Sequence, residues 1–166
     1  MNVEDLVSEE LVLFTNQKDQ QLLLGEVADL LVSKGKTKSS YKQAVIDREK
    51  VFPTGLETEH FSIAIPHTDS VHVNEPAIAI AILENKVPFI QMGSNDVIQI
   101  EILFMLALRK AEDQLEILQL LIELIQDEKN MEKLRNARNP TDVILCIKQF
   151  SYETLEKGKD YDSTNR

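Results

Sequence analysis

Apolar residues in the first third of the chain recur with the period of helices. Four of them fall at i, i+4, i+7 and i+8 and share one helical face: Leu23, Val27, Leu30 and Leu31. Asp19 can cap this helix and Gly35 suits the position after its last turn, so we predict a helix from about residue 20 to residue 34. A second helix is predicted over residues 41–50, because Ser40 opens it with capping-box spacing and a Pro-Thr-Gly turn follows it.

Strands are predicted where apolar residues alternate with smaller ones or run together over a short length. Residues 9–15 give the first such segment. Phe61, Ile63 and Ile65 alternate with smaller residues and predict a second strand. This strand stops at Pro66, because proline lacks the backbone N–H that a sheet ladder needs.

The middle of the chain contains the longest apolar segments. Residues 77–83 are continuously apolar, which indicates a central strand that is covered on both faces. We expect a turn at residues 84–86 and a short strand at residues 87–90, with Pro88 at or near a sheet edge. The run over residues 97–108 should begin as another strand, because isoleucines alternate there with polar residues.

The last third of the chain is helical in pattern. The strongest helix is predicted over residues 112–126. Its inward face is expected to hold Leu115, Leu118, Ile122 and Ile125, widened by Ile117, Leu121 and Leu124. Further helices are predicted over residues 128–135 and 142–150, the latter capped by Thr141. Residues 151–166 are polar and are expected to extend this last helix and then fray into a disordered tail.

Helices before, between and after several strands indicate a single layered α/β domain with a mixed sheet over residues 1–150. The 166-residue length is sufficient for a proper core. The 18 Lys and Arg against 28 Asp and Glu give a net charge of −10, which argues against nucleic-acid binding and favours a basic protein partner.

Composition also bears on the cellular setting. The single cysteine, Cys146, excludes an internal disulfide and is expected in the core. No signal peptide is visible, and the longest uncharged apolar run, residues 76–83, is too short to span a bilayer. We therefore expect a cytoplasmic protein with no direct membrane insertion.

The chemistry is expected at His67. It follows a predicted strand and the rigid Pro66 and precedes a short polar loop, so a firm support would hold an accessible side chain. A neutral imidazole can attack phosphorus near pH 7. The competing interpretation is a histidine in a surface loop with no role.

Phosphoryl transfer through an imidazole needs donors around the phosphoryl oxygens. Thr68 and Ser70 can supply hydroxyl groups, and Arg48 can supply a guanidinium from a predicted helix end. Arg48 could instead be a solvated charge that pairs with Asp47 or Glu49.

A metal site is the other alternative, because His60 and His72 flank His67 within thirteen residues. Their spacings suit no helical pair, and the cysteine is remote. Walker, GxGxxG and GxSxG motifs are absent from the sequence, so nucleotide binding and serine-hydrolase chemistry have no support.

Two segments taken together resemble a known family. They are Arg-Glu-Lys-Val-Phe-Pro-Thr-Gly-Leu at residues 48–56 and Ile-Ala-Ile-Pro-His at residues 63–67. They resemble the fructose/mannitol-type enzyme IIA domain of the bacterial phosphoenolpyruvate:sugar phosphotransferase system. The segment Thr-Glu-His-Phe-Ser-Ile-Ala-Ile-Pro-His at residues 58–67 is most similar in sequence to galactitol-class members. The resemblance covers about residues 5–150.

The resemblance implies a fold and a role. The fold would be a three-layer α/β/α sandwich with a mixed sheet. His67 would accept a phosphoryl group from the phosphocarrier protein HPr and pass it to a cysteine of a IIB component, with Arg48 near the phosphoryl oxygens. The protein would then be a phosphotransferase that serves sugar transport, and no cofactor or metal is implied.

One departure from the family pattern concerns a second histidine that many members carry ahead of the long helix. The matching stretch here is Glu-Asp-Gln-Leu at residues 112–115, so Gln114 occupies that place. Glutamine can orient His67 or contact phosphate, but it cannot carry a positive charge. Gln114 agrees with a galactitol-like member, which implies a role in uptake of galactitol or a related polyol or sugar. A regulatory phosphoprotein of the same fold is the alternative.

Overall fold

The computed structural model of the protein describes residues 2–164, with side chains as far as residue 158. The described residues form helices α1 (Gln20–Ser33), α2 (Tyr41–Val51), α3 (Ala111–Gln126), α4 (Glu128–Arg135) and α5 (Pro140–Thr164). They also form strands β1 (Val12–Thr15), β2 (Gly55–Glu57), β3 (Ser62–Ala64), β4 (Ala77–Ile90) and β5 (Val97–Ala107). Three short 3₁₀ segments complete the chain: η1 (Val3–Asp5), η2 (Glu9–Leu11) and η3 (Ser70–His72).

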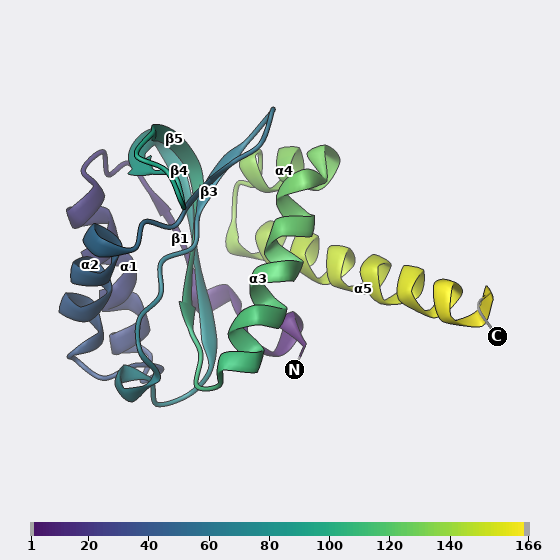
Figure 1. The fold of residues 1–166 in the computed structure, drawn as a ribbon, viewed down its shortest axis with the longest axis horizontal. Coiled ribbons are helices and arrows are strands. Elements are labelled where there is room, and N and C mark those ends of the chain that lie inside the picture. Colours follow the sequence, from purple (N-terminus) through teal and green to yellow (C-terminus); the bar gives the residue numbers. More distant parts are fainter. Residues whose placement is uncertain (1, 165–166) are drawn as a thin grey trace.

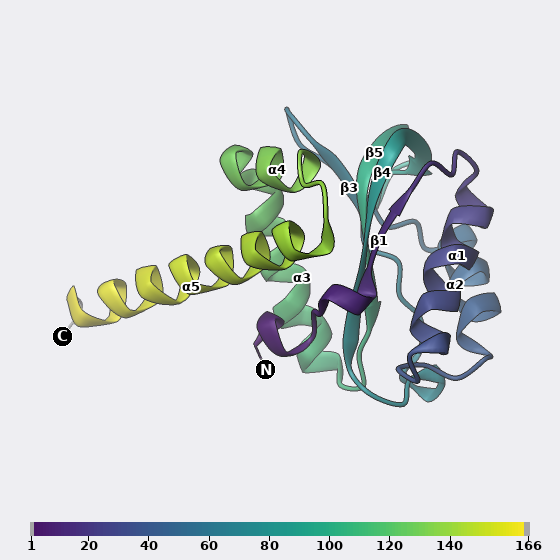
Figure 2. The same ribbon diagram turned by 180° about the vertical axis from the view of Figure 1, so that it is seen from behind.

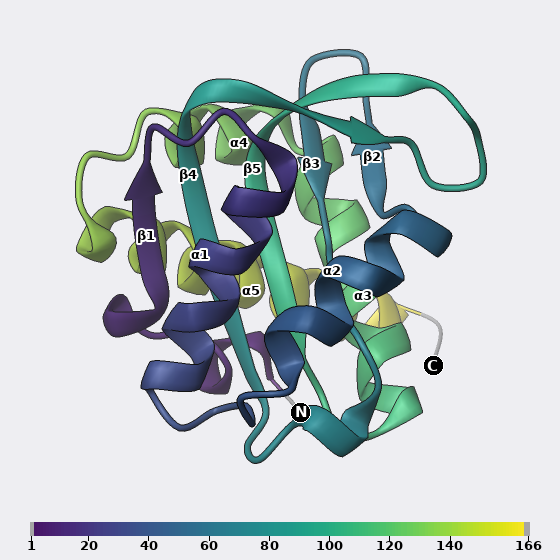
Figure 3. The same ribbon diagram turned by 90° about the vertical axis from the view of Figure 1, so that its left-hand side faces the viewer.

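The described strands form one sheet in the order β1-β4-β5-β3-β2. β1 pairs with β4 and β3 with β5 in parallel, whereas β4 pairs with β5 and β2 with β3 in antiparallel fashion. Helices α1 and α2 lie on one side of this sheet and α3, α4 and α5 on the other (Figures 1 and 3). The predicted three-layer α/β/α sandwich with a mixed sheet is confirmed.

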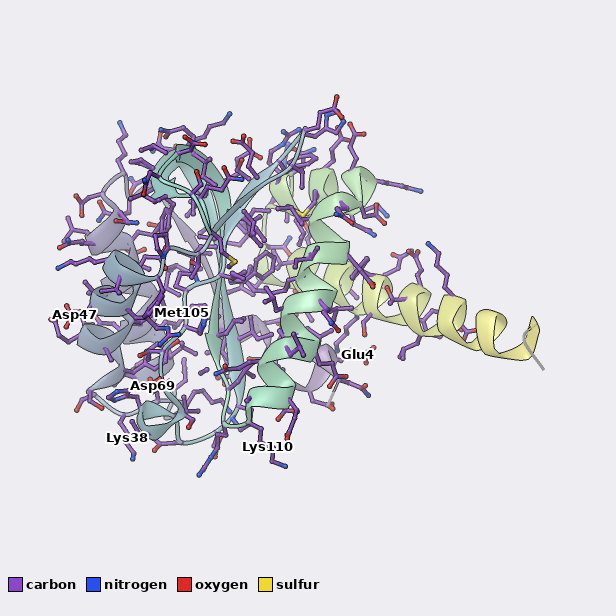
Figure 4. The ribbon with its side chains drawn as sticks, in the orientation of Figure 1. Glu4, Lys38, Asp47, Asp69, Met105 and Lys110 are labelled. Atoms are coloured by element: carbon purple, nitrogen blue, oxygen red, sulfur yellow. The ribbon has the colours of Figure 1, made fainter. Side chains whose placement is uncertain are left out.

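The core consists of two clusters, one on each face of the sheet, and alternate residues of the central strand β4 belong to different clusters. Ile78, Ile80 and Ile82 pack toward α3 and α5, while the alanines between them, Ala77, Ala79 and Ala81, face α1 and α2. Met105 of β5 belongs to the second cluster, and Figure 4 labels it beside α2. The isoleucines therefore fill the thicker layer, and the alanines allow α1 to pack closely on the sheet.

Two strand predictions need correction. Residues 9–11 form the 3₁₀ segment η2 rather than the start of a strand, and β1 begins at Val12. The turn expected at residues 84–86 is a bulge within β4, where the register with β5 shifts between Ile82 and Val87. Glu84 and Lys86 are exposed there, so a polar triplet is accommodated without ending the strand.

The first helix agrees with its prediction. The side chain of Asp19 accepts a hydrogen bond of 2.9 Å from the backbone N–H of Leu22. Gly35 adopts a φ of 73°, the left-handed conformation expected after a helix end. The second helix begins and ends close to its predicted limits, although Ser40 makes no side-chain cap hydrogen bond.

The helices of the last third differ in detail. The buried residues of α3 are Ile117, Leu121, Leu124 and Ile125. Leu115 was expected to face inward and is exposed, so the helix is rotated relative to the predicted face. Asn139 caps α5 by accepting from the N–H of Asp142, rather than Thr141.

Helix α5 continues to Thr164, well past its expected end at residue 150, and its second half extends away from the domain (Figure 2). The expected extension of the last helix is therefore present. The end of the predicted disordered tail, residues 165–166, lies outside the described residues. None of the helices that the structure describes is long and apolar enough to cross a membrane.

Candidate functional site

The segment that carries His67 continues from β3 along the edge of β5. The N–H of Ile65 donates to the carbonyl of Thr54 at 3.3 Å. The carbonyl of Pro66 accepts from the N–H of Leu106 at 2.9 Å, and His67 itself bridges to Leu106. Strand β3 ends at Ala64, before Pro66, as predicted, yet pairing with β5 resumes beyond it because proline lacks only the donor and its carbonyl still pairs. This pairing holds His67 on the sheet.

The imidazole of His67 is oriented by its own backbone. Its Nδ1 atom lies 3.1 Å from the carbonyl oxygen of Ile65. A carbonyl oxygen only accepts hydrogen bonds, so in the neutral ring the proton is on Nδ1 and the lone pair is on Nε2. Nε2 has no hydrogen-bond partner among the described residues. The ring therefore offers one nitrogen as a nucleophile.

The surroundings keep this ring neutral. Burial lowers the pKa of His67 below its ordinary value of 6.5, and the positive charge of Arg48 lowers it further. The hydrogen bond to Ile65 and the negative charge of Asp69 act in the opposite direction. Since the net effect is a lowered pKa, the imidazole is unprotonated at neutral pH, as a nucleophile must be.

Arg48 lies beside His67 at the end of α2. Its Nη1 atom is 3.7 Å from Oδ1 of Asp69, and its guanidinium carbon is 5.0 Å from the centre of the Phe52 ring. Its Nε atom is buried and has no hydrogen-bond partner among the described residues. A guanidinium held on two sides in the groove that His67 also lines is suited to receive an anion.

The alternative that Arg48 pairs with Asp47 or Glu49 is wrong. Asp47 accepts from Gln43 Nε2 at 2.9 Å, and the carboxylate of Glu49 is bonded to Thr54. Figure 4 shows Asp47 on the outer side of α2, whereas Asp69 lies nearer the sheet.

Two grooves meet at His67. The larger has a volume of about 620 Å³ and is lined on its other sides by Arg48, Phe52, Thr54, Met92 and Ser94. The smaller has a volume of about 250 Å³ and is lined by Ile65, Leu106, Gln114, Leu115 and Leu118. A larger cavity of about 850 Å³ lies elsewhere, and its lining includes none of the predicted site residues.

The structure brings together three of the predicted site residues. Arg48 lines the larger groove and Gln114 lines the smaller one, and His67 lines both. Thr68 is buried and Ser70 is exposed in η3, and neither is among the described residues that line the two grooves.

Sequence reasoning missed the tip of the β4–β5 hairpin. Met92, Gly93, Ser94 and Asn95 line the larger groove, and the N–H of Met92 donates to the carbonyl of Gly55 at 2.7 Å. The Gly-Ser-Asn sequence marks a turn, and Gly93 indeed has a φ of 73°. The sequence carries no signal that this turn reaches the loop after α2.

The other candidate groups are dispersed. His60 Nε2 lies 3.6 Å from a carboxylate oxygen of Glu128, and His72 Nδ1 lies 2.8 Å from the Ser40 hydroxyl. Within residues 2–158, no group of three His, Cys, Asp or Glu side chains could hold a metal ion. Cys146 is buried as expected, and burial raises the pKa of its thiol to about 11.

An α/β/α domain that presents a neutral imidazole beside an arginine has the groups that a phosphoryl carrier needs. The family model of the phosphoenolpyruvate-dependent sugar phosphotransferase system, EIIA 2, matches residues 5–150. The chain therefore belongs to this family, and it is a phosphoryl-carrying EIIA component of the phosphotransferase system (PTS). The resemblance found in the sequence is confirmed.

A relative supports this assignment, and solved structures share the fold. The PTS galactitol-specific EIIA component of Escherichia coli (strain K12) is 30% identical over 116 residues, which cover 70% of this chain and 77% of that protein. The crystal structure described as that of a PTS IIA protein (PtxA) from Streptococcus mutans has a TM-score of 0.77 at 20% identity, covering 92% and 96% of the two chains. The complex of enzyme IIAMTL with phosphorylated enzyme IIBMTL from E. coli has a TM-score of 0.72 at 21% identity, covering 86% and 97%.

Proposed function

We propose that His67 is the residue that carries the phosphoryl group, accepting it from phospho-HPr and transferring it to a cysteine of a IIB component. The observation that supports this most directly is the hydrogen bond between Nδ1 of His67 and the Ile65 carbonyl. It leaves Nε2 as the nucleophile, in a ring whose pKa burial lowers.

The transfer follows from this geometry. The lone pair of Nε2 attacks the phosphorus of phospho-HPr, the new Nε2–P bond forms, and the bond to the donor nitrogen breaks with its electron pair returning to HPr. The Nδ1 proton stays in place, so positive charge develops on the ring. The Ile65 carbonyl, at 3.1 Å, stabilises that charge through the hydrogen bond. In the second step a thiolate of the IIB component attacks the same phosphorus and the electron pair returns to Nε2.

Arg48 is assigned to the phosphoryl oxygens. Its guanidinium lines the same groove as His67 and is fixed by Asp69 and the Phe52 ring. Positioned donors of this kind stabilise charge on the transferring group. Gln114, in the other groove, can donate an amide N–H to a phosphoryl oxygen or to a partner. Thr68 and Ser70 remain candidates for supporting roles.

The transported compound is proposed to be galactitol or a related polyol or sugar. This rests on the galactitol-specific relative at 30% identity and on Gln114, which stands where many members of the family carry a second histidine. A IIB component as acceptor is supported by the complex of the mannitol enzymes. The acidic net charge of −10 favours the approach of a basic donor protein.

Phosphorylation in a reconstituted relay tests the proposal. The protein is incubated with phosphoenolpyruvate, enzyme I and HPr, its intact mass is recorded, and the label is mapped. One acid-labile phosphoryl group on Nε2 of His67 is expected. His67→Ala should remain unlabelled, while His72→Ala, which removes a histidine bonded to Ser40, should be labelled normally.

Normal labelling of His67→Ala would refute the assignment. Discharge of the labelled protein onto a galactitol-class IIB component would support the transport role. Labelling without discharge onto any galactitol-, mannitol- or fructose-class IIB component would favour the regulatory phosphoprotein instead.

A further inference from the structure

Glu49 is a carboxylate that the phosphoryl-transfer scheme above does not use, yet it is almost fully buried. It lies in the last turn of α2, next to Arg48, with a relative exposure of 5%. A carboxylate is costly to remove from water, and it is retained in a protein where hydrogen bonds satisfy both of its oxygens. Both oxygens of Glu49 are satisfied, and by a single residue.

That residue is Thr54, which is 3% exposed. Oε1 of Glu49 accepts from the backbone N–H of Thr54 at 2.9 Å, and Oε2 accepts from its hydroxyl at 2.8 Å. Two bonds from one carboxylate fix both the backbone and the side chain of Thr54. The turn through Phe52 and Pro53 is thereby closed onto the end of α2.

A short series of hydrogen bonds leads from Thr54 to the imidazole. The carbonyl of Thr54 accepts from the N–H of Ile65 at 3.3 Å, and the carbonyl of Ile65 faces Nδ1 of His67 at 3.1 Å. The peptide that orients the imidazole is thus itself held by the residue that Glu49 holds. Thr54 also lines the groove that contains Arg48 and His67.

The structure assigns Glu49 as a positioning residue: through its two hydrogen bonds to Thr54, it holds the Ile65 carbonyl where that carbonyl keeps the His67 proton on Nδ1 and Nε2 free. This inference rests on the proposed role of His67 as phosphoryl acceptor. Glu49 contacts neither the phosphoryl group nor a partner in this scheme, and it acts through Thr54 alone.

The carboxylate is suited to this task for a chemical reason. In this arrangement both groups of Thr54 donate, and the carboxylate accepts them at two separate oxygens. Glutamine has one acceptor oxygen, and its amide nitrogen only donates. That amide nitrogen could instead only donate to the hydroxyl oxygen, which would turn the hydroxyl proton away from residue 49. Burial raises the pKa of Glu49 to about 7 against the two Thr54 hydrogen bonds, which lower it. Those bonds therefore favour the ionised form, which predominates only above about pH 7.

Two substitutions break the link from opposite sides. Glu49→Gln removes one acceptor, and Thr54→Val removes the hydroxyl donor while keeping a similar volume. Thr54→Ser keeps the hydroxyl. Asp47→Asn is the matched control, because Asp47 is an exposed carboxylate on the same helix that bonds to Gln43.

Two measurements are made on each variant. The first is the rate of phosphoryl transfer from phospho-HPr over a series of donor concentrations. The second is the ¹⁵N chemical shift of each nitrogen of the His67 imidazole in the unphosphorylated protein, which reports the tautomer directly.

Glu49→Gln and Thr54→Val are each expected to lower the maximal transfer rate about tenfold, as a small displacement of a reacting group does. The donor concentration at half-maximal rate should stay the same. The ¹⁵N shifts should show the proton distributed over both ring nitrogens. The double variant should be no slower than either single one, because both break the same link. Thr54→Ser should recover the rate lost in Thr54→Val, and Asp47→Asn should match the unsubstituted protein.

A reduced melting temperature with an unchanged maximal rate and an unchanged tautomer would overturn the inference and leave Glu49 a purely structural residue. If Glu49→Gln fails to fold, the Thr54 variants still decide between these outcomes. Should the unsubstituted protein take no label on His67, the proposed function fails. The tautomer measurement needs no phosphorylation and would still test the link between Glu49 and His67.

Discussion

The Nδ1 atom of His67 is 3.1 Å from the carbonyl oxygen of Ile65, two residues earlier in the chain. The imidazole is therefore oriented by the backbone of its own segment and not by a second side chain. On the expectation from the sequence that Gln114 takes the place of a second histidine, this relationship accounts for the substitution. A ring that the backbone already orients needs no neighbouring imidazole to fix its proton.

Arg48→Ala is expected to slow phosphoryl transfer from phospho-HPr about a hundredfold, because a positioned donor to the transferring group is lost. Its ion pair with Asp69 spans 3.7 Å at the surface, so the free energy of unfolding should change by less than about 1 kcal/mol. Quenched time courses measure the transfer rate, and urea denaturation measures the free energy of unfolding. Lys42 lies on the same helix as Arg48 and pairs with Asp29 of α1, so Lys42→Ala is the control. An Arg48→Ala protein with the control's transfer rate would contradict the assigned role.

The titration of His67 should have a midpoint below pH 6.5, because burial lowers its pKa. Arg48→Ala should move the midpoint up and Asp69→Asn should move it down, since the two charges act on the ring in opposite directions. As the pH falls, His67 takes up its proton at a higher pH in the unfolded chain than in the folded protein, because its folded pKa is the lower one. The contribution of His67 to stability is therefore present above pH 6.5 and is lost as the pH falls through its folded pKa.

An NMR titration of the ring Cε1–H resonance, assigned with His67→Ala, gives the midpoints. Urea denaturation at several pH values below 6.5 gives the stability effect. A midpoint above 6.5 in the unsubstituted protein, or shifts of the opposite sign in the two variants, would show that burial does not control this ring.

Leu115→Asp should weaken the encounter with phospho-HPr. Leu115 is 59% exposed and lines the smaller groove with His67, so a docking partner would cover an apolar side chain there. Loss of that contact and introduction of a charge should raise the donor concentration at half-maximal rate about tenfold. The melting temperature should not change. Leu145→Asp alters an equally exposed leucine (61%) on α5 and should leave the transfer kinetics unaltered. Equal effects of the two substitutions would place docking elsewhere.

Gly55→Ala should destabilise the domain. A Cβ atom at residue 55 would lie 2.7 Å from the Ile90 carbonyl oxygen and 2.8 Å from Cδ1 of Ile98, and the carbonyl belongs to a paired strand. We expect a loss of about 2 kcal/mol in the free energy of unfolding, measured by urea denaturation. Gly158→Ala has open space around its new methyl group in α5 and should stabilise slightly, because alanine favours a helix. An unchanged stability for Gly55→Ala would mean that the hairpin tip moves away freely.

Cys146→Ser should leave phosphoryl transfer unchanged. The thiol is buried and its pKa is raised to about 11, so it stays protonated at neutral pH and is a poor nucleophile. Its Sγ atom donates to the Asn130 carbonyl at 3.5 Å, and a hydroxyl can replace that bond at a cost of about 1 kcal/mol for its burial. Intact-mass labelling and denaturation measure both quantities. A folded Cys146→Ser protein that takes no label would revive a thiol mechanism.

The local pattern of apolar and polar residues predicted most of the helices and strands. It failed where tertiary contacts determine whether a strand continues or which face of a helix is buried. The polar triplet at residues 84–86 has the composition of a turn, yet β5 pairs on both sides of it and β4 continues as a bulge. The apolar arc of α3 is wide, so periodicity alone could not say which part faces the core. Packing against the sheet leaves Leu115 outside and Ile117 inside.

The candidate site was predictable as far as its residues are marked by short-range sequence signals. His67 follows a strand and Arg48 precedes a turn, and both signals lie within a few residues. The groove around them is not local, because the N–H of Met92 meets the carbonyl of Gly55 across 37 residues of chain (92 − 55). The link from Glu49 to Thr54 spans only five residues, but it depends on the burial of both, which the sequence does not express.

The single accessible nitrogen of His67 has a consequence for kinetics and stereochemistry. In the proposed relay one atom receives the phosphoryl group and releases it, so donor and acceptor proteins compete for the same position and exclude each other. Such a carrier follows a double-displacement rate law, in which double-reciprocal plots at different acceptor concentrations are parallel lines. Each in-line displacement inverts the configuration at phosphorus. A chiral phosphoryl group that arrives at Nε2 and departs from it therefore leaves with the handedness it brought.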